Sequence, residues 1–114
     1  MKTKYFLSTI IASFITVISF AQVKTTVQKD TIKVYGECGM CKSKIEKAAK
    51  TAGAVSAVWN DETKMLALKY DTKKTDAKKI QAKIAGVGYD TQDVTATDKA
   101  YESLPECCHY ERKK

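Results

Sequence analysis

Apolar side chains recur along this chain with two different periods, and the period changes at glycines and at polar turns. Alternation over Thr31–Tyr35 places Ile32 and Val34 on one face, which is the two-residue period of a half-buried strand. Two further β-prone runs, Val55–Trp59 and Met65–Tyr70, are separated by five polar residues, a length suited to a hairpin. The pattern therefore predicts three strands, and the second and third are expected to pair antiparallel.

Helical spacing follows the first and the third of these strands. Apolar residues at helical intervals and lysines on the remaining surface predict an amphipathic helix over residues 41–52, ended by Gly53. A second helix is predicted to begin near Thr75, because the threonine hydroxyl can accept a free backbone N–H. We expect this helix to end at Gly86 or Gly88.

A last strand and a short helix complete the predicted elements. The strand is expected at Tyr89–Thr95 and the helix at Asp98–Leu104, where Pro105 ends it. Two strand–helix–strand units of this kind predict an α+β, ferredoxin-like sandwich. Its four-stranded antiparallel sheet would carry both helices on one face, and a short cysteine-rich tail would follow.

The first 21 residues do not belong to this domain. Lys2 and Lys4 precede an apolar stretch that ends at Ala21, which is typical of a secretory signal peptide cleaved before Gln22. A retained membrane anchor is the alternative, but five serines and threonines interrupt the stretch and it is short for a span. We therefore expect an exported protein, periplasmic or extracellular, that does not span the membrane after processing. Its expected organisation is a signal peptide at 1–21, a domain at 22–96 and a tail at 97–114.

Charge and length narrow the classes of partner. The chain has a formal charge of +7, of which Lys2 and Lys4 contribute two, so the processed chain of 93 residues carries +5. The remaining lysines are interleaved with acidic residues and do not alternate with the aromatic side chains that stack on bases. The composition argues against nucleic-acid binding, and the length allows one small domain.

The sequence Cys-Gly-Met-Cys at residues 38–41 lies between the first strand and the first helix. Two thiols at this spacing can converge on one soft metal ion or close into a disulfide. Cys41 falls in the first helical turn, where the helix dipole and free N–H groups favour the thiolate. Thiolates select Cu(I) and related soft ions over Mg²⁺ or Ca²⁺, whereas structural zinc needs four ligands. Met40 is expected to pack in the loop, with thioether ligation as the alternative.

Four segments of the chain carry a resemblance to a known family: CGMCKSKIEKA at residues 38–48, AVSAV at 54–58, LKYD at 68–71 and AGVGYD at 85–90. With these segments in this order, the chain from Thr31 to Val94 resembles the heavy-metal-associated domain, the module of copper chaperones, copper-pump N-termini and periplasmic mercury-binding proteins. The resemblance implies a ferredoxin-like fold, metal binding through Cys38 and Cys41, and a position for Tyr89 near the metal loop. The family usually has Gly-Met-Thr before its first cysteine, where this chain has Tyr-Gly-Glu.

The tail adds three soft or borderline ligands, Cys107, Cys108 and His109, in consecutive positions. Adjacent cysteines rarely bond to each other because the ring is strained. These residues are therefore expected to share or extend the metal site, to form disulfides with Cys38 or Cys41, or to remain unused. The connection before them is long enough to reach across so small a domain.

These observations favour an exported soft-metal-binding protein that catalyses no reaction. Cu(I) is the expected ion, with Hg(II), Zn(II) or another soft metal as alternatives. The ion would be buffered or passed to a metal-transporting membrane pump or another thiol-bearing carrier. Two rival functions use the same cysteines, a small thiol–disulfide oxidoreductase and a disulfide-stabilised interaction domain without metal. Against the first rival, the chain has no proline between Cys41 and Pro105 to face a redox motif.

Overall fold

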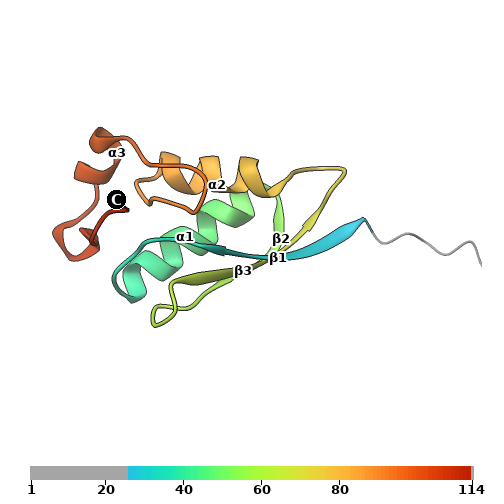
Figure 1. The fold of residues 1–114 in the computed structure, drawn as a ribbon, viewed down its shortest axis with the longest axis horizontal. Helices are drawn as coiled ribbons and strands as arrows, with labels where there is room; N and C mark the ends of the chain where they lie inside the picture. The colour runs from blue at the N-terminus through green and yellow to red at the C-terminus, as the bar shows by residue number, and fades with distance from the viewer. Residues whose placement is uncertain (1–25, 114) are drawn as a thin grey trace, which may run out of the picture.

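The fold was obtained as a computed structural model that describes residues 26–113. The predicted signal peptide, residues 1–21, lies outside this range. Within the described range, no helix combines the length and the apolar character that crossing a membrane requires. The elements follow in the order β1 (Val27–Lys33), α1 (Gly39–Thr51), β2 (Ala54–Trp59), β3 (Met65–Asp71), α2 (Ala77–Gly86), α3 (Asp98–Glu102) and the 3-10 turn η1 (Glu106–Cys108) (Figure 1).

The sheet has β3 at its centre, paired antiparallel with β1 on one side and β2 on the other. Leu66 of β3 lies opposite Ile32 of β1 and Trp59 of β2, and all three side chains are buried. Ile45 of α1 and Ile80 of α2 join them in one hydrophobic core. The predicted hairpin and the two longer predicted helices are thus confirmed, because alternating and helical apolar patterns each direct one face into this core. The short third helix is also present, as α3.

The predicted fourth strand, Tyr89–Thr95, is reduced to a single bridge between Thr91 and Val34, the residue that follows β1. The buried side-chain oxygen of Gln81 explains the difference. It accepts hydrogen bonds from the Thr91 hydroxyl (2.9 Å) and from the backbone N–H of Asp93 (2.8 Å). These bonds turn the chain away from β1, so the sheet has three strands among the described residues.

The start of α2 also differs from the prediction, by one residue. Asp76, and not Thr75, is the N-cap, and its carboxylate accepts a hydrogen bond from the backbone N–H of Lys79 (2.8 Å). Thr75 is buried instead, and its side chain packs against Gly53. The expected end of the helix at Gly86 is confirmed.

The C-terminal segment folds back to the end of the molecule where α1 begins, as the orange and red ribbon in Figure 1 shows. Gly88 permits the approach of α3, because a Cβ there would lie 2.7 Å from the carbonyl oxygen of Ala100 and 2.9 Å from Leu104. The φ angle of Gly88 is +114°, which also favours glycine. Leu104, Cys108 and Tyr110 are buried in the same core as the sheet. The tail therefore packs as part of the domain.

Candidate metal centre

Three thiols meet at the N-terminus of α1. The Sγ atoms of Cys38, Cys41 and Cys108 all lie within 4.8 Å of one another, and those of Cys38 and Cys41 are 4.0 Å apart. Cys41 and Cys108 are fully buried, whereas Cys38 is partly exposed. Within residues 26–113 no two cysteines form a disulfide. The cluster is therefore a set of free thiols that solvent reaches from the side of Cys38.

The start of α1 places the first two thiols. Cys38 is the N-cap, with an extended backbone (φ −138°, ψ −177°), and Cys41 is in the first turn, as predicted. Within the described chain the Cys38 side chain makes no capping hydrogen bond, and the first turn contains no acidic residue. The free N–H groups and the positive end of the helix dipole thus face the thiols, which favours negative charge on sulfur.

Trp59 supports the loop that carries Cys38. A Cβ at Gly36 would lie 2.9 Å from the Trp59 ring and 3.1 Å from Ile45. The indole N–H donates a hydrogen bond to the carbonyl oxygen of Val34 (3.0 Å), which fixes the ring under the loop. Gly36 stands where the family usually has methionine, so the ring fills space that a side chain at that position would need. From the sequence, Trp59 is predicted only as a strand residue; the signals that point to its role are that it is the single tryptophan of the chain and that Gly36 has no side chain.

A polar contact ties the first turns of α1 to the end of β2. The Lys42 ammonium lies 2.7 Å from the Glu46 carboxylate and donates to the carbonyl oxygen of Trp59 (2.8 Å). The same carboxylate accepts the backbone N–H of Trp59 (2.9 Å). Burial opposes ionisation of Glu46, but the hydrogen bonds and the charge of Lys42 outweigh it and lower its pKa. This contact fixes the helix that carries Cys41 against the strand that carries Trp59.

The thiols of Cys41 and Cys108 influence each other's ionisation. Burial disfavours the Cys41 thiolate, but a hydrogen bond from the Cys108 thiol and backbone groups of the loop outweigh it, so the pKa of Cys41 is lowered. Burial and the same contact raise the pKa of Cys108. Cys41 is therefore the first of the two to lose its proton, and the Cys108 proton stabilises the charge that results.

Tyr89 lies at this cluster, as the resemblance implied. The side chain is fully buried, and its hydroxyl has no hydrogen-bond partner of good geometry among residues 26–113. Burial, together with the neighbouring thiols of Cys41 and Cys108, raises the pKa of this hydroxyl. The phenol is thus a neutral donor that faces two sulfur atoms.

The other ligands that the sequence suggested lie outside the cluster. Cys107 is exposed, and its Sγ contacts the thioether sulfur of Met40 (3.7 Å), while its carbonyl oxygen accepts a hydrogen bond from the Cys38 thiol (3.5 Å). His109 is exposed and stacks on Tyr101, with ring centroids 4.9 Å apart. Of the three consecutive tail residues, the structure brings only Cys108 to the first two thiols.

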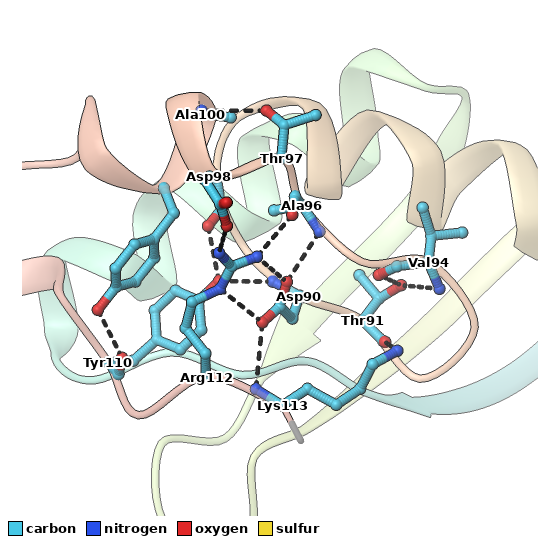
Figure 2. A network of polar contacts seen from close by, with 12 residues as sticks. Asp90, Thr91, Val94, Ala96, Thr97, Asp98, Ala100, Tyr110, Arg112 and Lys113 are labelled. Atoms are coloured by element: carbon cyan, nitrogen blue, oxygen red, sulfur yellow. Dashed lines mark hydrogen bonds and ion pairs between the residues drawn. The ribbon is translucent and has the colours of Figure 1, made fainter.

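An ionic network holds the end of the chain in place (Figure 2). The buried carboxylate of Asp90 accepts hydrogen bonds from the Arg112 guanidinium (3.0 and 3.1 Å) and from the backbone N–H groups of Ala96 (2.8 Å) and Lys113 (3.1 Å). Arg112 also contacts Asp98 (2.6 Å). Burial alone would raise the pKa of Asp90, but Arg112 and the backbone donors lower it below its usual value. The network stabilises the segment that follows Cys108.

Tyr110 links this network to the thiol cluster. Its hydroxyl accepts the backbone N–H of Asp90 (2.7 Å) and donates to the carbonyl oxygen of Gly88 (2.7 Å). Its ring stacks on Tyr89, with centroids 5.7 Å apart. Sequence reasoning missed Tyr110 and Arg112, because no local pattern indicates which residues of a tail bind back to the domain.

Comparisons with known proteins agree with the fold and the position of the loop. The family described as "Heavy-metal-associated domain" matches residues 31–90, a range that includes Cys38 and Cys41 but not Cys108. No curated protein sequence matches the chain. Among solved structures, similarity is found to a CopZ metallochaperone, with 32% identity, a TM-score of 0.53 and coverage of 56% of this chain and 98% of that one.

Two further solved structures are similar over the same share of the chain. Oxidized MerP from Ralstonia metallidurans CH34 is 26% identical with a TM-score of 0.55, and the match covers 58% of this chain and 94% of that one. The water-soluble region of the P-type ATPase CopA from Bacillus subtilis is 31% identical with a TM-score of 0.52, and the match covers 57% of this chain and 44% of that one.

Proposed function

Because the chain belongs to the heavy-metal-associated domain family, we propose that it binds a soft metal ion, Cu(I), through the thiolates of Cys38 and Cys41. The observation that carries this proposal is the pair of sulfur atoms 4.0 Å apart at the N-terminus of α1. Both side chains reach one point from a single helical turn. Sulfur ligands of this kind select Cu(I) over the hard divalent ions.

The electrostatics of the loop support the same proposal. A metal ion binds the thiolate and not the thiol, so a site that favours the deprotonated form binds metal at higher affinity. The lowered pKa of Cys41 and the free N–H groups of the first helical turn both act in this direction. Hg(II) and Zn(II) are the competing ions to compare, since both also bind thiolates.

The proposed role is to buffer the ion or to pass it on outside the cytoplasm, with no reaction catalysed. Export rests on the signal peptide predicted at residues 1–21. The similarity to a CopZ metallochaperone supports a carrier role, and the similarity to the soluble region of the P-type ATPase CopA supports a metal-transporting pump or another thiol-bearing carrier as the partner. Transfer between such proteins would exchange one pair of thiolates for another.

A competition titration tests the proposal. The processed chain, reduced and kept free of oxygen, is titrated against a Cu(I)–bicinchoninate complex, and withdrawal of Cu(I) from the chelator measures affinity. The double variant C38S/C41S should lose tight binding and keep the circular dichroism of the parent. Cys107→Ser is the matched control, because Cys107 is an exposed thiol outside the cluster. If C38S/C41S competes as well as the parent, these cysteines are not the ligands.

A further inference from the structure

The C-terminal segment supplies a sulfur atom that the family match does not include. Cys108 lies beyond residues 31–90, yet its Sγ is within 4.8 Å of both Cys38 and Cys41. We propose that Cys108 is a third thiolate ligand, so that the bound ion is three-coordinate and the C-terminal segment closes the site. This inference rests on the proposed binding of Cu(I) by the first two cysteines.

The spacing of the first two sulfur atoms fits three ligands better than two. A thiolate bond to a first-row ion such as zinc is about 2.3 Å long, so three sulfur atoms in a plane around one ion lie about 4.0 Å apart. Two sulfur atoms on opposite sides of an ion would lie about 4.6 Å apart at the same bond length. The Sγ atoms of Cys38 and Cys41 are separated by 4.0 Å. The Sγ atom of Cys108 lies within 4.8 Å of both, so it is near enough to serve as the third ligand.

The buried hydroxyl of Tyr89 is consistent with charged sulfur atoms at this place. It is fully buried without a partner of good geometry among residues 26–113, and it lies beside Cys41 and Cys108. A buried donor without an acceptor is costly, and a neutral thiol is only a weak acceptor. A metal-bound thiolate is a much better acceptor, because it carries negative charge. Binding of the ion by Cys108 and Cys41 would therefore give this hydroxyl a partner.

Hydrogen bonds and an ion pair hold the segment around Cys108 against the domain. The backbone N–H of Cys108 donates to the carbonyl oxygen of Pro105 (2.8 Å) in η1. Two residues later, the Tyr110 hydroxyl is held by Gly88 and Asp90 (2.7 Å each), and Arg112 is bound to the Asp90 carboxylate (Figure 2). A ligand on a segment that is fixed by its own contacts loses little conformational freedom on binding, which raises affinity.

The position of the C-terminal segment also limits how the ion can leave the site. The carbonyl oxygen of Cys107 accepts a hydrogen bond from the Cys38 thiol, so the tail lies against the loop that carries the first ligand. An incoming thiol would meet the site only from the exposed side of Cys38, because Cys41 and Cys108 are fully buried. A third buried ligand therefore favours retention of the ion over rapid transfer.

X-ray absorption of the Cu(I)-loaded processed chain counts the sulfur ligands directly. We expect three in the monomeric fraction of the parent, three in Cys107→Ser and two in Cys108→Ser. The competition titration should show that Cys108→Ser lowers Cu(I) affinity by more than about tenfold, which corresponds to 1.4 kcal/mol. Cys107→Ser is the matched control, because it removes the neighbouring thiol, which lies outside the cluster.

The possible outcomes separate this inference from the function on which it rests. Two sulfur ligands in the parent, with unchanged affinity in Cys108→Ser, would overturn the third ligand and leave Cu(I) binding by Cys38 and Cys41 intact. No Cu(I) binding by the parent would overturn both. If Cys108→Ser does not fold, the ligand counts of the parent and Cys107→Ser still decide, since neither depends on that variant. Three ligands in the parent and two in Cys107→Ser would overturn the inference, because Cys107 and not Cys108 would then supply the third sulfur.

Discussion

The ring of Trp59 lies 2.9 Å from the point where a Cβ at Gly36 would stand, so a strand residue occupies the space beside the metal loop. The loop is supported from β2 at the position where the family usually has a methionine side chain. Because the indole N–H is also bound to the Val34 carbonyl oxygen, the ring cannot move away without losing a buried hydrogen bond. The size of the side chain at residue 59 therefore limits the size of the side chain that residue 36 can carry.

Replacing Gly36 by alanine should destabilise the metal-free protein by about 1–3 kcal/mol, because the new methyl group overpacks against the ring. Urea unfolding measures the change. Gly39→Ala is the matched control, since a Cβ at residue 39 meets no atom within 4 Å. In the double variant G36M/W59V the methionine should recover part of the stability lost in W59V. Equal stability of the two alanine variants would contradict this account of the loop.

The part of the site that lies in one short stretch was predictable from the sequence. The Cys-Gly-Met-Cys spacing and the following helical pattern are local, so they placed Cys38 and Cys41 at a helix N-terminus, where the structure has them. The choice of Cys108 over Cys107 and His109 was not predictable. That choice depends on which way η1 directs each side chain after the chain has folded back, and contacts distant in the sequence determine it.

The fold shows the same division between local and distant contacts. Strands with clear alternation and helices with clear helical periods were predicted, because each pattern needs only its own residues. The strand expected at Tyr89–Thr95 failed because Gln81, ten residues before Thr91, binds the chain in a turn. The N-cap of α2 is Asp76 and not the predicted Thr75, because the Thr75 side chain is buried and does not cap the helix.

Removing the charge of Arg112 should weaken the attachment of the C-terminal segment. Arg112→Ala leaves the Asp90 carboxylate buried without its cation, which should cost about 3 kcal/mol, the low end of the range for such a change. Asp98→Ala removes the other ionic contact of Arg112, but Asp98 is largely exposed, so little change is expected. Thermal unfolding of the two variants gives the comparison. Similar losses of stability in the two variants would show that the buried contact with Asp90 contributes no more than the exposed contact with Asp98.

The stability of the metal-free protein should fall in acid because of Asp90. The pKa of Asp90 is lower in the folded state than in the unfolded chain. As the pH falls, the unfolded chain therefore takes up this proton first, and protonation favours unfolding. The contribution is therefore complete above the unfolded value of about 3.9 and is lost as the pH falls through the lower folded value. Urea unfolding between about pH 6 and pH 3 should show this decline.

The variant Asp90→Asn distinguishes the contribution of Asp90 to the acid sensitivity from the contributions of the other carboxylates. The variant should be less stable than the parent at neutral pH, and its stability should depend less on pH in acid. Some dependence should remain, since the pKa of Glu46 is also lowered by its contact with Lys42. An unchanged slope in Asp90→Asn would show that Asp90 does not contribute to the acid sensitivity.

Cu(I) affinity should rise as the pH rises from about 5 to 8, because protons compete with the ion for the thiolates. The lowered pKa of Cys41 makes its proton the easier one to displace, whereas the raised pKa of Cys108 makes proton competition there stronger. Chelator competition at several pH values measures the slope for the parent and Cys108→Ser. The slope should be smaller in Cys108→Ser, since one proton fewer is released. Affinity independent of pH in the parent would argue against cysteine ligands altogether.

The four thiols should react with iodoacetamide in an order set by their burial. Cys107 is exposed and should be alkylated first, Cys38 is partly exposed and should follow, and the fully buried Cys41 and Cys108 should react last. Mass spectrometry of digested samples, taken over time from reduced protein, gives the rate at each position. Addition of Cu(I) before the reagent should protect Cys38 strongly and leave the rate at Cys107 almost unchanged, because only the former lies in the cluster. Protection of Cys107 with continued reaction at Cys38 would place the ion against Met40 and Cys107, on the exposed side of the loop, instead of among the three clustered thiols.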